Sequence, residues 1–123
     1  MVRYAEKPTT PGLVFMDGPS YDPVCVTGQT ASGATLIAMS TGRGTSFGSL
    51  PAPTLKIAAG DGRAQDDIDI NCSAVLDGTA SIAAMGEVIF QSLLWHASGE
   101  KTKSEADGMG ENEFVPWPVG VLA

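Results

Sequence analysis

Three short apolar runs along the chain predict the strands of a parallel sheet. They cover residues 12–16, 35–39 and 54–59, and apolar positions dominate each run without strict alternation. Runs of this kind are typical of strands that are buried on both faces, as in parallel sheets. The first run ends in Asp17-Gly18-Pro19, which predicts a turn.

The stretch between the first two runs predicts a helix. Asp22 can serve as its N-cap, Pro23 is tolerated at the first helical position, and Gly33 is a suitable residue for its end. Strand, helix and strand over residues 12–39 would form a βαβ unit with parallel strands and a right-handed connection.

The clearest helix pattern covers residues 81–98. Ser81 is a fair N-cap, and Gly99 is favourable just past the end. Apolar side chains recur at helical spacing, namely Ile82, Met85, Ile89 and Leu93, with Phe90, Leu94 and Ala97 widening the stripe. Such a broad stripe predicts packing on the face of a sheet.

Together these elements predict one α/β domain. We expect a short, mainly parallel sheet of three or four strands flanked by helices, in a Rossmann-like three-layer arrangement. Residues 1–11 indicate an entering arm, and residues 12–123 the domain itself. Two aromatic residues between the prolines of 114–118 predict a docked tail.

Composition and charge exclude several classes of protein. With 43% apolar residues among 123, the chain can fill a core, and no apolar run approaches the ~20 residues that span a bilayer. The net charge of −7 and the dispersed basic residues argue against nucleic-acid binding. Cys25 and Cys72 are far apart, which favours two buried, reduced thiols. No signal peptide opens the chain, so we expect a cytoplasmic protein.

The loop at residues 41–46 is a candidate anion site. It follows a predicted strand, and ligands bind at the carboxyl ends of parallel strands. Two glycines let the backbone approach an anion, and Arg43 offers a fork that suits a carboxylate or phosphate. A plain tight turn with a surface arginine is the alternative. The loop is neither a P-loop nor a dinucleotide fingerprint.

The other polar groups give weaker indications of a functional site. The acidic run at 66–71 could hold Mg²⁺ or Ca²⁺, but composition favours a solvated acidic edge on a half-buried strand. His96, the single histidine, indicates a partly exposed surface side chain, and a transition-metal site needs more His or Cys ligands. Lys101 and Lys103 suit either a helix C-terminus or a cationic wall for an anionic substrate.

In combination, seven ordered segments resemble the C-terminal region of the altronate/galactarate dehydratase family, to which the sulfolactate sulfo-lyase large subunit is related. The resemblance runs from about Gly12 to the end of the chain. Its segments are MDGP at 16–19, VTGQTASG at 26–33, STGRG at 40–44, PTLK at 53–56, DDIDINC at 66–72, SGEKTKSE at 98–105 and EFVPW at 113–117. Residues 59–65 are fewer than the family usually has, and Ser73 stands where glycine is common.

The resemblance implies a cytoplasmic hydro-lyase that removes water from a hexonate or hexarate sugar acid to give a 2-keto-3-deoxy acid. It implies a divalent metal (iron, manganese or magnesium), bound mainly outside this chain. Partners would be the sugar acid and the N-terminal and middle regions of the dehydratase, on the same or a separate chain. This chain alone would be catalytically incomplete, and a homo-oligomer stays open.

Carried over residue by residue, the family pattern gives the candidate substrate-binding residues. Arg43 is the expected carboxylate ligand, and no residue is assigned as the catalytic base or as a metal ligand. The full set is Thr41, Gly42, Arg43, Gly44, Lys56, Asp67, Asp69, Asn71, Lys101, Lys103 and Glu105. Two alternatives remain, a stand-alone module that binds an acidic metabolite and a small interaction subunit that completes a larger dehydratase chain.

Overall fold

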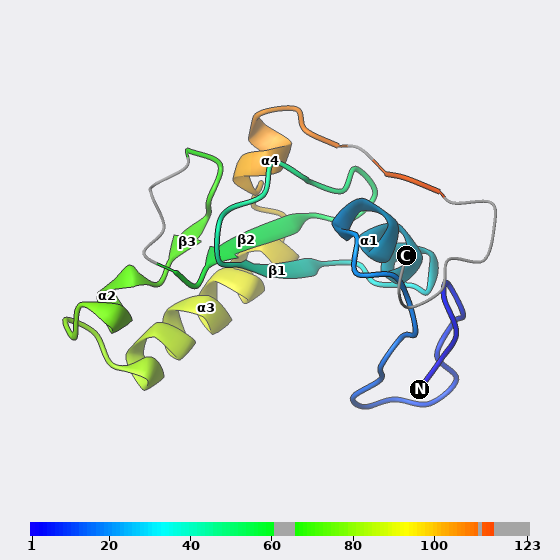
Figure 1. Cartoon of the computed structure of the whole chain (residues 1–123), viewed down its shortest axis with the longest axis horizontal. Helices are drawn as coiled ribbons and strands as arrows, with labels where there is room; N and C mark the ends of the chain where they lie inside the picture. The colour runs from blue at the N-terminus through cyan, green and yellow to red at the C-terminus, as the bar shows by residue number, and fades with distance from the viewer. Residues whose placement is uncertain (61–65, 111, 115–123) are drawn as a thin grey trace.

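A computed structural model describes residues 1–60, 66–110 and 112–114 (Figure 1). Over these residues one helix comes first, three strands follow it, and three further helices come after the strands. The elements are α1 (Asp22–Ala31), β1 (Ile37–Thr41), β2 (Thr54–Ala58), β3 (Ile70–Asn71), α2 (Ser73–Leu76), α3 (Ile82–Ala97) and α4 (Lys103–Ala106).

The strands form one parallel sheet in the order β1-β2-β3. Ile37 lies beside Thr54 and Thr41 beside Ala58, while β3 adds the short pairing of Ala58 with Asn71. The predicted α/β fold with a short parallel sheet is therefore confirmed. β2 matches the third apolar run closely, and β1 overlaps the second run but begins and ends two residues later.

The sheet separates two small cores. On one face, Val26 of α1 packs with Ile37 of β1. On the other face, Leu55 and its neighbours in the sheet pack against α3. Since side chains alternate along a strand, the register that pairs Ala38 with Leu55 places Ile37 and Leu55 on opposite faces. Helices thus cover both faces of the sheet, and Met85, Ile89 and Leu93 are the α3 residues that do so.

The first apolar run is not a strand of this sheet, so the predicted βαβ unit over residues 12–39 is wrong. Within the described residues, this segment pairs only through an isolated bridge between Val2 and Met16. Leu13 is 89% exposed, so the run contributes little to either core. An apolar run predicts a strand only where a neighbouring strand accepts its backbone groups, and here only the arm offers one.

The helix ends follow local capping rules. α3 was predicted closely, since the Ser81 hydroxyl accepts the Ala84 amide at 3.1 Å and Gly99 has φ +108°. At the end of α1, Gly33 has φ +110°, as a helix-terminating glycine should. The α1 start differs slightly from the prediction, because Tyr21 is the N-cap and Asp22 is already helical.

The arm at residues 1–11 is held against α1. The Tyr4 hydroxyl donates to the Val24 carbonyl at 2.7 Å. Its ring lies directly over Gly28, where a methyl group would overlap it. Gly28 is therefore needed for close approach of the arm to the helix.

This contact gives a matched pair of glycine substitutions. Gly28→Ala should lower the free energy of unfolding by about 1–3 kcal/mol, because the added methyl group displaces the Tyr4 ring. In Gly86→Ala, in α3, the added methyl group meets no atom within 4 Å. This variant should raise the free energy of unfolding by about 0.5–1 kcal/mol, because alanine has the higher helix propensity. Urea denaturation of both variants measures the difference, and equal effects would contradict the arm contact.

The chain end before residue 115 is partly docked. The Asn112 carboxamide accepts the Leu50 amide at 3.1 Å, and the Glu113 amide donates to the Thr27 hydroxyl at 3.1 Å. Phe114 itself is exposed, and residues 115–118 of the predicted docked tail lie outside the described residues. In the part of the chain that the structure describes, no helix is long and apolar enough to cross a membrane.

Candidate functional site

The carboxyl edge of the sheet carries the predicted glycine-rich loop. Thr41, Ala58 and Asn71 end the three strands side by side. Just beyond β1, the Thr41 hydroxyl accepts the Gly44 amide at 3.0 Å, and Gly44 has φ +91°. This turn presents Arg43 at the surface. The loop thus has the place that ligand-binding loops occupy in open α/β sheets.

A second glycine supports the loop from the end of β2. A methyl group on Gly60 would lie 2.7 Å from the carbonyl oxygen of Gly42. Real contacts of this kind are not that short, so only glycine at position 60 lets the two backbones approach. The chain leaving β2 therefore packs directly against the Arg43 loop.

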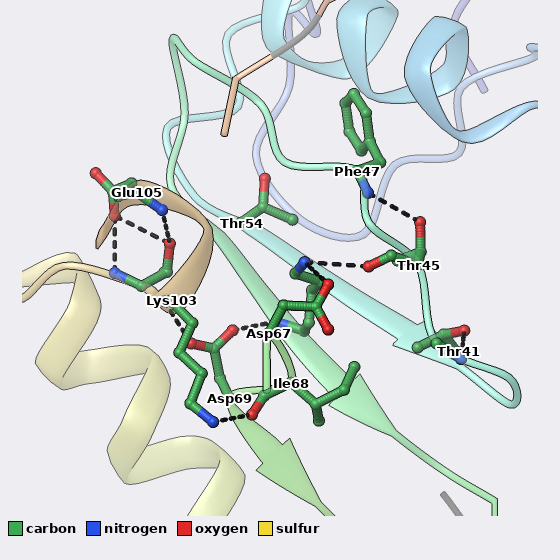
Figure 2. A network of polar contacts seen from close by, with 12 residues as sticks. Thr41, Thr45, Phe47, Thr54, Asp67, Ile68, Asp69, Lys103 and Glu105 are labelled. Atoms are coloured by element: carbon green, nitrogen blue, oxygen red, sulfur yellow. Dashed lines mark hydrogen bonds and ion pairs between the residues drawn. The ribbon is translucent and has the colours of Figure 1, made fainter. Parts of the chain in front are cut away.

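Lys56 lies under the same loop and is completely buried, with 0% of its side chain exposed. Its ammonium nitrogen donates to the Asp67 carboxylate at 2.7 Å and to the Thr45 carbonyl at 3.0 Å (Figure 2). Buried charges need such partners. The lysine thus ties β2, the acidic segment and the Arg43 loop together, instead of offering its charge to solvent.

Asp69 bonds the backbone of β2 through both its amide and its side chain. Its amide donates to the Lys56 carbonyl at 3.1 Å, and its carboxylate accepts the Lys56 amide at 2.7 Å. The other carboxylate oxygen accepts the Lys103 amide at 2.9 Å, at the start of α4 (Figure 2). One carboxylate therefore satisfies backbone donors of β2 and α4 at the same time.

These contacts correct the prediction of a solvated acidic edge. The edge was expected along residues 66–71, but only Ile70–Asn71 form a strand. Asp67 and Asp69 are both half-buried and bonded within the fold, whereas Asp66 is exposed. The pattern of alternating polar residues was real, but the partners of these carboxylates come from elsewhere in the chain.

The predicted residues on α4 mainly hold the fold. The Lys103 ammonium donates to the Ile68 carbonyl at 2.6 Å. Glu105 and Thr102 form a capping box, in which each side chain bonds the other's backbone. Lys101 is exposed just before this helix. The helix is thereby fastened to the segment that precedes β3.

The candidates accordingly fall into three groups. The first lies at the carboxyl edge, with the loop 41–44 and Asn71, whose side-chain oxygen also accepts the Ser73 amide at 2.9 Å. The second is the buried Lys56–Asp67 pair beneath it. The third is α4, which Asp69 joins to the sheet. Glu105 bonds within the capping box of α4, and Lys101 is exposed just before that helix.

The described residues do not by themselves fit a metal ion. Among them, no three His, Cys, Asp or Glu side chains come together as ligands; one Asp67 oxygen bonds Lys56, and both Asp69 oxygens accept backbone amides. His96 is half-buried, as predicted, with Nδ1 3.0 Å from the Glu100 carbonyl. Burial, and then the charge of Asp22, raises the pKa of the half-buried Cys25 thiol, which keeps it protonated at neutral pH.

The sequence did not predict a polar groove beside the loop. A cavity of about 600 Å³ lies between the start of α1, the segment 46–48 and the segment 108–110. A smaller cavity of about 340 Å³ shares Tyr21 and Ser46 with it and also reaches Thr45. The Tyr21 hydroxyl donates to Glu113 at 3.2 Å on its wall. The glycines at 108 and 110 were the sequence feature that could have indicated this hollow.

Comparison with known proteins yields one family and three curated relatives. The sequence model of "D-galactarate/Altronate dehydratase, C-terminal" matches residues 1–122, which includes the arm. Galactarate dehydratase (L-threo-forming) of Escherichia coli K12 is 36% identical over 121 residues, covering 93% of this chain and 23% of the relative.

The other two relatives are also several times longer than this chain. The (2R)-sulfolactate sulfo-lyase subunit beta of Chromohalobacter salexigens is 35% identical over 114 residues, covering 90% of this chain and 29% of the relative. Altronate dehydratase of Escherichia coli K12 is 31% identical over 114 residues, covering 90% and 23% respectively. The chain thus spans about a quarter of the length of the curated relatives that it matches.

Proposed function

Because this chain belongs to the D-galactarate/altronate dehydratase family, as a match to its C-terminal region, we propose that it contributes part of the substrate site of a sugar-acid dehydratase. The substrate is a hexonate or hexarate of the altronate or galactarate type, and the product is a 2-keto-3-deoxy acid. The names of two relatives, galactarate dehydratase and altronate dehydratase, support this substrate class.

One observation carries the assignment of the site. Arg43 is exposed on a loop at the carboxyl edge of the sheet, and the buried Lys56 fixes that loop from below. A guanidinium in a fixed place can bind a carboxylate through two parallel hydrogen bonds. Arg43 therefore binds the carboxylate of the sugar acid. The polar groove at Tyr21 and Ser46 accommodates substrate hydroxyls.

The reaction explains why a cation is needed there. Dehydration removes the proton on the carbon next to the carboxylate, and the hydroxyl on the following carbon leaves as water after protonation. The resulting enol tautomerises to the 2-keto acid. Negative charge accumulates on the carboxylate during proton removal, and Arg43 stabilises it. The base comes from the other regions of the dehydratase, as does any divalent metal.

In this proposal most of the remaining candidates hold the Arg43 loop or its surroundings in place and do not bind the carboxylate themselves. Lys56 and Asp67 are positioning residues, because their charges satisfy each other and the Thr45 carbonyl. Asn71 stands at the same sheet edge as Thr41 and is close enough in register to share the site. The exposed Lys101 adds positive charge near α4, and Lys103 and Glu105 keep that helix in place.

The test is substitution of Arg43 in the complete enzyme. Arg43→Ala should lower kcat/KM for the sugar acid about 10- to 100-fold, since a hydrogen-bonded charge contributes about 1.5–3 kcal/mol. Arg43→Lys should recover part of the loss, because it restores charge without the fork. Lys7→Ala, which removes an exposed cation from another surface, is the control. Unchanged kcat/KM in Arg43→Ala, at unchanged thermal stability, would refute the assignment.

One relative supports a second possibility, in which the same function is carried out by an assembly of separate chains. The sulfo-lyase relative is named as a subunit beta, so at least one enzyme with this region works as an assembly of chains. A stand-alone binding module is the remaining alternative. An antibody against this chain separates these cases by the native mass of the polypeptide and by what purifies with it. Binding of galactarate by the isolated chain without turnover would favour the module.

A further inference from the structure

Helix α3 exposes an apolar surface that the described residues of its own domain do not cover. Its inner side packs on the sheet through Met85, Ile89 and Leu93, but none of its residues is fully buried. Polar groups along its outer side are few, chiefly Glu87 and Gln91, which bond each other at 2.7 Å. A helix that is apolar nearly all round is normally buried. Its exposed large apolar residues are Ile82, Val88, Phe90, Leu94 and Trp95.

One flank of this helix continues into an apolar groove. Ile82, Gly86, Phe90 and Leu94 follow one another at four-residue spacing and so share a flank. A groove of about 270 Å³ lies between this flank and α2, and Leu76 and Ile82 line it together with Gly86. Leu76 is 63% exposed and Ile82 80% exposed. Gly86 leaves room for close approach, since no atom lies within 4 Å of its missing side chain.

The groove opens at the same sheet edge as the Arg43 loop. Its wall includes Ala59 and Cys72, the residues that directly follow β2 and β3. Figure 1 shows α2 beyond the ends of these strands. Gly60, next to Ala59, is the residue that packs on the Gly42 carbonyl. A protein segment seated in the groove would therefore lie beside the loop that presents Arg43.

We infer that the α2–α3 groove, with the flank of Ile82, Gly86, Phe90 and Leu94, is the docking surface for the other regions of the dehydratase. The curated relatives are about three to four times as long as this chain, so the domain has further protein to pack against in each of them. The occupant is an apolar segment of that polypeptide, covalently joined or supplied by a partner chain. Its seating beside Gly42 completes the substrate site.

Charge argues against a second copy as the occupant. Each copy carries a net charge of −7, so two copies repel. Among the described residues, the groove and the flank bear no ionisable side chain except the thiol of Cys72, so these residues offer no cation to offset this repulsion. The docking rests on the family membership, and only its effect on the substrate site rests on the proposed function.

A photo-crosslinking experiment in the source cells tests the docking. Benzoylphenylalanine replaces Ile82 in one variant and Gln91 in the other. Nine residues along a helix amount to two and a half turns, so the two probes sit on opposite sides of α3. We expect the probe at 82 to crosslink to dehydratase peptides outside these 123 residues, at least tenfold more than the probe at 91.

The outcomes distinguish the proposals. Crosslinks at position 82 between two copies of this chain, to unrelated proteins only, or at a yield equal to position 91 would overturn the docking surface. Ile82→Glu should abolish association with the other regions, while the melting temperature of the chain alone stays within about 2 °C because this side chain is 80% exposed. The crosslink should persist in Arg43→Ala, so loss of turnover in that variant tests the substrate proposal separately.

Discussion

Replacing Asp67 with alanine should destabilise the fold more than any other single substitution considered for this chain. The change removes the carboxylate from the Lys56 ammonium, which has 0% exposure and keeps its hydrogen bond to the Thr45 carbonyl. Removing one member of a buried ion pair typically costs about 3–5 kcal/mol, because the other charge stays desolvated. Urea denaturation of the wild-type chain and of Asp67→Ala measures this loss.

The same pair predicts that a second substitution restores stability. Lys56→Met combined with Asp67→Ala should be more stable than Asp67→Ala alone, since a buried ion pair replaced by apolar side chains is often nearly neutral. Lys56→Met alone should cost less than Asp67→Ala, because the Asp67 side chain is 16% exposed and can reach water. A double variant less stable than Asp67→Ala would show that Lys56 is needed for its packing and not for the pair.

Replacing Asp69 should have the second-largest effect, about 3 kcal/mol for Asp69→Ala. Its carboxylate accepts the Lys56 amide at 2.7 Å and the Lys103 amide at 2.9 Å, and hydrogen bonds to a charged group contribute about 1.5–3 kcal/mol each. Asp69→Asn keeps one acceptor oxygen for two donors, so it should cost about half as much. Asp66→Asn, at an exposed neighbour, should change stability by less than about 0.5 kcal/mol.

Hydrogen exchange locates the Asp69 effect. In Asp69→Ala, the amides of Lys103 and of the rest of α4 should exchange faster than in wild type, because the helix loses its tie to β2. Amides of α3 should exchange at wild-type rates once the overall loss of stability is taken into account. Uniform acceleration across both helices would mean that the carboxylate does not fasten α4 specifically.

The sequence predicted best those elements that form because of residues within or next to the element itself. α3 needed only a capping serine, a helical repeat of apolar residues and a glycine at its end. β1 and β2 followed from short apolar runs. The run at 12–16 had the same local pattern, yet it has no place in the sheet, because strand formation also requires a neighbour that the pattern cannot specify.

The site was predictable in position but not in its contacts. The Arg43 loop was placed correctly after a strand, since a glycine-rich turn at such a point is a local feature. Asp67 bonds Lys56, which lies eleven residues earlier on β2, and the Ile68 carbonyl bonds Lys103, which lies thirty-five residues later on α4. Such pairings depend on the register of the sheet and the docking of α4. Lys56 was therefore expected to meet substrate directly, whereas the structure gives it partners within the fold.

The burial of Lys56 has a consequence for how the enzyme responds to ionic strength. Mobile ions screen exposed charges over about 8–10 Å at physiological salt, but they reach a buried pair poorly. The geometry of the Arg43 loop should therefore be the same in dilute buffer and in concentrated salt. In the site proposed above, the attraction between the exposed Arg43 and a doubly charged hexarate should weaken as salt rises. Added sodium chloride would then raise KM while leaving the melting temperature nearly constant, which separates the group that attracts the substrate from the group that holds the scaffold.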